Sequence, residues 1–228
     1  MPDSVAPEHF FEWNEQMIRR YDPEAVNRQP RGIVRWVERK RVSTVLRCLD
    51  AQAGEHLLDV GCGAGQLLSK LPGANRYGVD LSQHMVKQAR SRLPNGANIL
   101  HADAEHLPFP EATFDRVVAS SLFSHVLHPE RVVGELVRVT KPGGRVVISI
   151  CCEDQIERGM RWVKSLYLHT LFFGKPDPNR VAVYNIEYHL HRFSLARVRE
   201  IVGGQLKEIR VCAVPAIFPV HWIVVYQR

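Results

Sequence analysis

The chain has 228 residues, of which 45% are hydrophobic and 24% are charged, a composition typical of a globular protein with a full core. Its longest apolar run, residues 213–225, is too short to cross a bilayer and holds two prolines. The N-terminal segment, interrupted by glutamates, does not resemble a signal peptide. Five cysteines without a C-x-x-C spacing favour reduced thiols over disulfides or a zinc site. We therefore expect a cytoplasmic protein that binds no metal.

Two helices are predicted before residue 50, over residues 8–20 and 33–49. The second has one apolar face, because its valines and leucines recur every three to five residues. Much of the net charge of +6 lies in residues 28–47, which hold seven Lys or Arg and one acid, Glu38. This stretch is either a solvated helix face or a surface that attracts an acidic substrate, an anionic membrane or RNA. Aromatic residues do not alternate with the cations, and Trp36 is placed on the apolar side, so we expect no nucleic-acid partner.

After residue 50, short β-rich runs alternate with helical stretches, which predicts βαβ units and a mostly parallel sheet. The last two strands are separated only by "PAIFP" and should pair as an antiparallel hairpin. The expected fold is α/β, a Rossmann-like sheet of seven strands. The predicted strands are 56–60, 76–80, 97–102, 114–120, 144–150, 205–214 and 221–227, and the predicted helices are 66–71, 82–92, 129–139 and 194–203.

A glycine-rich loop follows the first predicted strand in "HLLDVGCGAGQLL", residues 56–68. Glycine lets backbone N–H groups approach a ligand closely, and such loops lie at nucleotide-cofactor sites beyond the carboxyl ends of strands. The dinucleotide pattern G-x-G-x-x-G is not met, because Gln66 stands where the third glycine belongs. The loop therefore predicts a nucleotide-like cofactor other than NAD.

Residues 50–150 resemble the class I S-adenosylmethionine-dependent methyltransferases, in particular the small-molecule group that includes ubiquinone, menaquinone and sterol methyltransferases (methyltransferase type 11). The motifs that carry the resemblance occur in the family's order. They are "LLDVGCGAG" (57–65), "GVDLS" (78–82), "ADAEHLPF" (102–109), "FDRVVAS" (114–120) and "LVRVTKPGGRVVIS" (136–149).

The resemblance implies S-adenosylmethionine as cofactor and gives roles to individual residues. Asp59 would support the loop and reach the cofactor's ammonium group, Asp80 would accept both ribose hydroxyls, and Asp103 would accept from the adenine amino group. Alternatives are an N-cap role for Asp80, for which Ser82 is better placed, and a turn role for Asp103. The expected cofactor-site residues are Asp59, Gly61, Cys62, Gly63, Gly65, Asp80, Leu81, Met85, Asp103, Ala104 and Ser120.

The segment after the fourth strand, "SSLFSHVLHPER" (120–131), faces the methyl group in this family. His125 is the best candidate for a base that takes a proton from the acceptor, and the alternative is a histidine that only orients the loop. Residues 151–193 form a long insertion rich in aromatics and histidines, in which residues 158–174 predict an amphipathic helix. This insertion is either a lid over a flat or lipophilic substrate or a subdomain that buries its own aromatics.

We expect a helical flap over residues 1–50, a cofactor-binding core over 51–150, a substrate lid over 151–193 and the remainder of the core over 194–228. A closed substrate pocket is expected between the flap and the lid. The expected substrate-binding residues are Phe11, Tyr21, Trp36, His125, Tyr167, Tyr184 and His189.

The sequence predicts an enzyme of small-molecule biosynthesis, a monomer or homodimer that methylates an aromatic or lipophilic molecule at O, N or C by in-line displacement. One alternative is a tRNA or protein methyltransferase, although "SSLF" stands where amino-directed nucleic-acid enzymes carry an asparagine-proline motif. A second is a cofactor-binding regulatory module without activity. A third, arsenite methylation, rests only on the adjacent Cys151 and Cys152 and needs about three converging thiolates.

Overall fold

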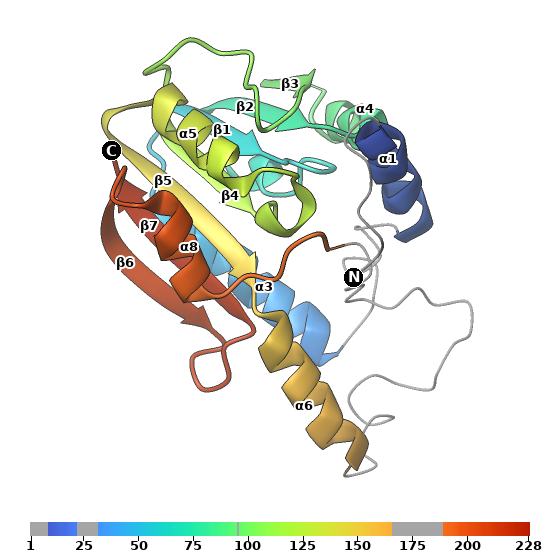
Figure 1. Ribbon diagram of the computed structural model, residues 1–228. Coiled ribbons are helices and arrows are strands. Elements are labelled where there is room, and N and C mark those ends of the chain that lie inside the picture. The colour runs from blue at the N-terminus through green and yellow to red at the C-terminus, as the bar shows by residue number, and fades with distance from the viewer. Residues whose placement is uncertain (1–8, 22–31, 95, 166–188) are drawn as a thin grey trace.

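A seven-stranded sheet forms the centre of the computed structural model, which describes residues 9–21, 32–94, 96–165 and 189–228 (Figure 1). The strand order is β3-β2-β1-β4-β5-β7-β6. The first five strands run parallel, and β7 pairs antiparallel with both β5 and β6. The strands are β1 (His56–Val60), β2 (Asn75–Asp80), β3 (Ala97–His101), β4 (Phe114–Ser120), β5 (Thr140–Cys151), β6 (Lys207–Val214) and β7 (His221–Gln227). The expected Rossmann-like sheet with its C-terminal hairpin is confirmed.

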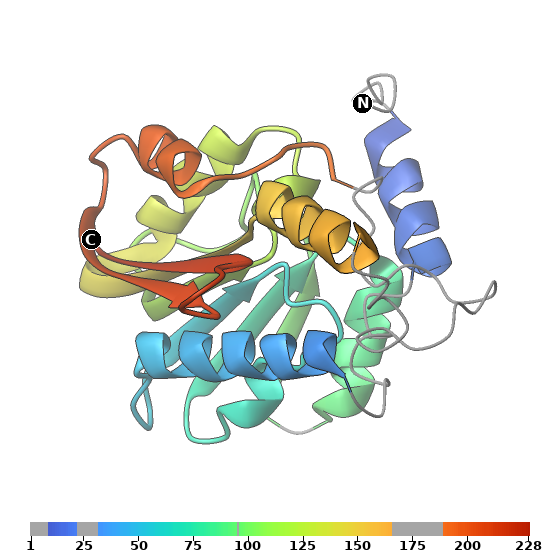
Figure 2. The same ribbon diagram turned by 90° about the horizontal axis from the view of Figure 1, so that it is seen from below.

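Helices cover both faces of the sheet (Figures 1 and 2). On one face, α5 (Pro129–Val139) and α8 (Leu195–Val202) bury their apolar sides in one core cluster with β1 and β4. On the other, α3 (Ile33–Leu49) and α4 (Gln83–Arg92) build a second cluster. The central strands are apolar on both sides, as strands buried between two helical layers must be.

The connection between β1 and β2 differs from the expectation. A helix is predicted over residues 66–71, but the structure has only a 3₁₀ turn, Leu68–Lys70. Pro72 lacks a backbone N–H and disfavours helical geometry in the residue before it, and Gly73 follows. Too few residues separate the glycine loop from this proline for a longer helix to form.

The N-terminal helix α1 (Phe10–Tyr21) lies over the start of α4 and the glycine loop. Its Ile18 packs with Ala64 and Met85, and its Glu15 accepts a hydrogen bond from the hydroxyl of Ser82 at 2.6 Å. Within residues 1–50, α1 therefore covers the loop, whereas α3 packs on the sheet.

The placement of Trp36 on the apolar side of its helix is wrong. Its side chain is 48% exposed, with the ammonium of Lys40 6.0 Å from the ring centroid. The buried stripe of α3 contains Val37, Val45 and Cys48, and Trp36 lies about 100° around the helix from Val37.

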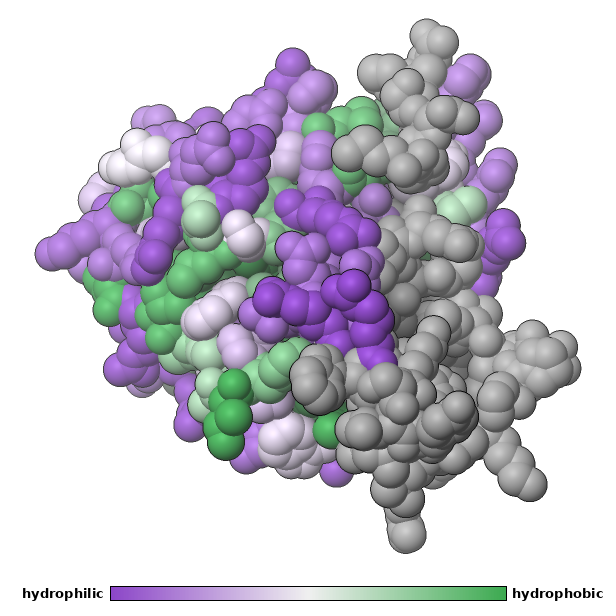
Figure 3. Space-filling model, turned by 60° about the horizontal axis from the view of Figure 1, so that its bottom comes forward, coloured by the Kyte–Doolittle hydropathy of each residue, from purple (hydrophilic) through white to green (hydrophobic). Residues whose placement is uncertain are grey.

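The helix α6 (Glu153–Ser165) begins directly after β5 and covers the first part of the amphipathic stretch expected over 158–174. It starts five residues earlier than that stretch, and residues 166–174 lie outside the described part. None of the described helices is both long and apolar enough to cross a membrane. Hydrophilic residues cover much of the described part of the face in Figure 3, with smaller hydrophobic patches between them.

Candidate active site

The glycine loop turns sharply between the end of β1 and the 3₁₀ turn Leu68–Lys70, with three glycines in the left-handed region. A Cβ on Gly61 would lie 2.8 Å from the side chain of Leu122, and one on Gly65 would lie 2.9 Å from that of Leu93. A Cβ on Gly63 would meet no atom within 4 Å. Two glycines thus allow close packing inside the protein, whereas Gly63 faces open space that a ligand can occupy.

Asp80 ends β2 and holds this loop. Its Oδ2 accepts a hydrogen bond from Gly63 N at 2.8 Å, and its Oδ1 accepts one from Ser82 N at 2.9 Å. Burial raises the pKa of Asp80, and the two backbone N–H groups oppose the shift. The N-cap of α4 is Ser82, whose hydroxyl accepts from Met85 N at 3.2 Å, so Asp80 has another role than capping the helix. The expected ribose contact stays a prediction.

Asp59 lies one strand away, on β1, and is only 3% exposed. Burial, together with the neighbouring charge of Asp80, raises the pKa of Asp59 to about 8, and Arg41 partly opposes this. Burial, and after it the same two carboxylates, raise the pKa of the Cys62 thiol well above its usual range. The carboxyl ends of β1 and β2 therefore concentrate acidic groups that would stabilise a cation.

Arg41 of α3 reaches this site, although the sequence analysis counted it only as part of a basic surface. Its Nη1 donates to the hydroxyl of Ser120, at the end of β4, at 2.5 Å. Its Nε and Nη2 donate to Glu38 at 2.9 and 2.7 Å. The second oxygen of Glu38 lies 3.2 Å from Nε2 of His221, a side chain that is 3% exposed.

This cluster sets the charge state of Glu38. Burial alone would raise the pKa of this carboxyl, but Arg41 and His221 lower it well below its usual range. One signal for Arg41 was present in the sequence, because residues 37, 41, 45 and 48 fall on one helical stripe whose other members are buried. A charged residue on an apolar stripe indicates a buried partner or a ligand.

On the side expected for adenine, Asp103 forms a turn after β3. Its Oδ1 accepts from Glu105 N at 2.9 Å, so the turn role weighed for it is present. Ala104 is 8% exposed, and Met85 is buried beneath α1 at 2% exposure. Leu81 is partly exposed beside them. The contacts of these residues with adenine stay predictions.

On the side expected for the acceptor, His125 ends the 3₁₀ turn Phe123–His125, and its ring is partly exposed. The ring packs edge-on against that of His189, with centroids 4.7 Å apart. His189 also contacts Glu153, whose Oε1 lies 2.5 Å from its Nδ1. The structure thus brings together two of the expected substrate-side residues, which are 64 positions apart, and adds a carboxylate that the sequence analysis missed.

The other expected substrate-binding residues are not brought together in this way. Phe11 and Trp36 are exposed, at 54% and 48%. Tyr167, Tyr184 and the side chain of Tyr21 lie outside the described residues, as does much of the expected lid. The role of these residues and the closed pocket between flap and lid stay predictions.

Comparison with known proteins identifies the core. Residues 58–148 match the family model described as a methyltransferase domain. Residues 58–148 form a methyltransferase domain. A demethylmenaquinone methyltransferase of Clavibacter sepedonicus is 39% identical to this chain over 112 residues, which are 47% of this chain and 45% of that protein. This chain therefore matches less than half of the length of that relative.

Solved structures share the whole fold around the methyltransferase domain. The N-methyltransferase NodS from Bradyrhizobium japonicum WM9, in complex with S-adenosyl-L-homocysteine, has a TM-score of 0.67 at 19% identity, covering 96% of this chain and 98% of that one. The [4+2]-cyclase SpnF has a TM-score of 0.69 at 18% identity, covering 96% of both chains. These likenesses show the fold alone. Since they cover 96% of this chain, the shared fold includes α1 and the C-terminal strands.

Proposed function

We propose that the protein transfers a methyl group from S-adenosylmethionine to a small aromatic or lipophilic molecule. The observation that carries this is the Gly63–Asp80 pair, an open glycine whose N–H donates to a partly buried carboxylate, inside a methyltransferase domain. The space above Gly63 and the acidic groups beside it fit a ligand that presents hydroxyl donors and a cationic group.

Different residues around the loop would bind different parts of the cofactor. Asp80 would accept the ribose hydroxyls, and Asp59 would face the ammonium group, with water between them where needed. Arg41, already fixed at the end of β4, would hold the carboxylate of the methionyl part. Asp103 and the N–H of Ala104 would bind adenine. When bound, the cofactor supplies an electrophilic methyl group on a sulfonium.

His125 is the proposed base on the acceptor side. It ends the 3₁₀ turn that begins after Leu122, whose side chain touches the glycine loop, so it lies beyond the carboxyl end of β4 where the acceptor should enter. For an acceptor that carries a proton at pH 7, His125 would take that proton. The rest of the catalysis is alignment of the acceptor with the methyl group in a site shielded from water.

A small acceptor is supported by the aromatic residues of 151–193 and by the similarity to a demethylmenaquinone methyltransferase. Methylation of tRNA or protein would need an open basic groove, and turnover would then fall steeply with salt. We expect only the weak salt dependence of one ion pair. The fold alone does not distinguish an enzyme of methyl transfer from another activity, because SpnF, named a [4+2]-cyclase, shares it.

Calorimetry with S-adenosylmethionine, S-adenosylhomocysteine and NADH tests the proposed cofactor. The first two should bind and NADH should not. Replacing Asp80 by Ala should weaken binding by about 1–3 kcal/mol, because the hydroxyls and the loop lose a charged acceptor. Asp115→Ala is the matched control, since this carboxylate binds His56 N and Lys141 instead of the loop. Unchanged affinity in Asp80→Ala, or micromolar NADH binding, would refute the proposal.

A further inference from the structure

A buried carboxylate stands behind the two histidines on the acceptor side. Glu153 is the first residue of α6, and its side chain is 1% exposed. Its Oε1 contacts Nδ1 of His189, and its Oε2 has no hydrogen-bond partner among the described residues. The guanidinium of Arg192 approaches that oxygen only to 3.6 Å.

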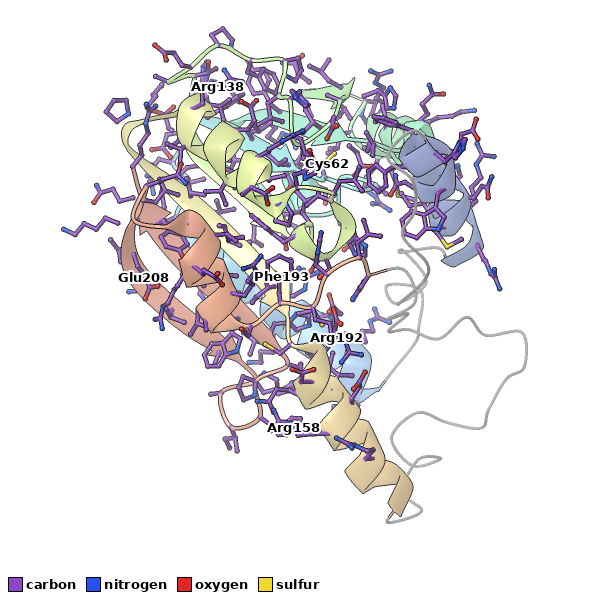
Figure 4. The ribbon with its side chains drawn as sticks, viewed as in Figure 1. Cys62, Arg138, Arg158, Arg192, Phe193 and Glu208 are labelled. Carbon is purple, nitrogen blue, oxygen red and sulfur yellow. The ribbon has the colours of Figure 1, made fainter. Side chains whose placement is uncertain are left out.

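His189 is a closer partner of Glu153 than Arg192 is. Arg192 directs its terminal nitrogens to two exposed acids of the same helix, Asp154 at 3.1 Å and Glu157 at 2.7 Å. Figure 4 shows Arg192 on the stretch that leads into α8, beside the first turn of α6. A carboxylate buried with one hydrogen bond is costly for stability. Asp154 and Glu157 already bind Arg192, so Glu153 is not needed to pair with it. The buried carboxylate of Glu153 therefore points to a role in holding the imidazole of His189.

The backbone holds His189 against His125. Leu190 N donates to Ser124 O at 2.7 Å, so the stretch around His189 is bonded directly to the turn that carries His125. His125 N in turn donates to Leu122 O at 2.8 Å, and the side chain of Leu122 touches the glycine loop. Phe193, buried at 6%, packs edge-on against Phe123 of the same turn. The two imidazoles are therefore fixed relative to each other and to the cofactor loop.

We propose that Glu153 is a positioning residue that fixes His189 in the tautomer with hydrogen on Nδ1. Nε2 of His189 then carries the lone pair, and His125 and His189 together take the proton of the methyl acceptor. This rests on the proposed methyl transfer. A carboxylate that accepts from one imidazole nitrogen leaves the other as the basic one, as in the Ser-His-Asp triad.

The proton and the electrons balance in this step. The acceptor's proton moves to an imidazole nitrogen of the pair, and the electron pair left on the acceptor atom forms its bond to the methyl carbon. The carbon–sulfur bond breaks with its electron pair going to sulfur, which loses its positive charge. The imidazolium later gives its proton to water, so no further reactant is required.

Nitrogen-15 NMR of the histidine side chains tests the tautomer at pH 8, where couplings to the ring protons show which nitrogen carries hydrogen. Wild-type His189 should be protonated on Nδ1 alone. Glu153→Gln should shift it toward the other tautomer or a mixture, because an amide can donate to Nδ1. The matched control is Asp154→Asn, the same chemical change one residue away in a side chain that touches Arg192, and it should leave His189 unchanged.

Several results would overturn the proposal. One is a wild-type His189 that has no hydrogen on Nδ1, and another is a wild-type His189 with hydrogen on both nitrogens. A third is a Glu153→Gln variant in which His189 keeps the wild-type tautomer. The wild-type spectrum decides even if Glu153→Gln fails to fold. S-adenosylhomocysteine should also shift the resonances of His125 and His189, and if neither moves, the pair does not lie at the site.

Calorimetry separates a failure of this proposal from a failure of the proposed function. Glu153→Gln should bind S-adenosylmethionine as tightly as the wild type does, and with an acceptor that carries a proton its kcat should fall roughly 10-fold or more with little change in KM for the cofactor. A wild-type protein that binds no S-adenosylmethionine refutes the methyl transfer. An intact affinity with an unchanged kcat in Glu153→Gln refutes only the role of Glu153.

Discussion

Replacing Arg41 by Ala should destabilise the protein far more than replacing any exposed arginine of the same helix. The variant loses two hydrogen bonds to Glu38, at 2.7 and 2.9 Å, and one to Ser120 at 2.5 Å. It also leaves Glu38 to the contact with His221, whose Nε2 lies 3.2 Å from the second carboxylate oxygen. Removing one partner of a fully buried ion pair costs about 3–5 kcal/mol. Because the Arg41 and Glu38 side chains are 15% and 18% exposed, we expect a loss of about 2–4 kcal/mol.

Urea unfolding at pH 7, followed by circular dichroism, measures this loss. Arg39→Ala, an exposed arginine on α3, is the control and should stay within about 0.5 kcal/mol of the wild type. The double variant Glu38→Gln/Arg41→Ala should recover part of the loss, because no carboxylate is then left unpaired. If Arg41→Ala and Arg39→Ala unfold at the same urea concentration, the cluster does not stabilise the fold as argued here.

The pH dependence gives an independent check of the same pair. The pKa of Glu38 is lowered in the folded protein, against the effect of its burial, by Arg41 and His221. A lowered folded pKa contributes stability above the ordinary value of 4.5, and this contribution is lost as the pH falls further. The stability gap between wild type and Arg41→Ala should therefore be complete at pH 7 and shrink below about pH 4.5.

Three further predictions concern the loop and the acceptor side. Asp59→Asn should gain stability relative to the wild type as the pH rises from 4 toward 8, measured by urea unfolding. Burial and Asp80 raise the folded pKa of Asp59 to about 8, so over this range only the unfolded wild type is stabilised by releasing the proton. Gly65→Ala should lower the melting temperature more than Gly63→Ala does, because of these two glycines it is Gly65 whose Cβ would meet other side chains. Gly63→Ala should chiefly weaken cofactor binding, as measured by calorimetry. His125→Ala should lower turnover about 10²–10⁴-fold with an acceptor that carries a proton and leave cofactor affinity nearly intact, and a near-normal rate would mean that alignment suffices.

The sheet and the cofactor loop could be predicted from the sequence, because both depend on local signals. Alternating strands and helices fix a parallel sheet, and the five-residue link "PAIFP" can only form a hairpin. Glycines at Gly61, Gly63 and Gly65 mark a turn with positive φ, which the structure has at all three. The absence of a longer helix after this loop could also be predicted from local sequence, since Pro72 prevents the turn Leu68–Lys70 from continuing.

Which charged residues reach the site depends on how the helices and strands pack together. Arg41 and Trp36 lie on one helix, and the sequence pattern places Arg41 on a basic surface and Trp36 on the apolar side. The packing of α3 on the sheet instead turns Arg41 inward and leaves Trp36 exposed. Glu153 and His189 are 36 residues apart and meet because β5 and the stretch before α8 end at the same side of the sheet. The helical stripe of residues 37, 41, 45 and 48 indicates that Arg41 faces inward, but its partner Ser120 and the contact between Glu153 and His189 depend on how the elements pack, which spacing along the chain does not encode.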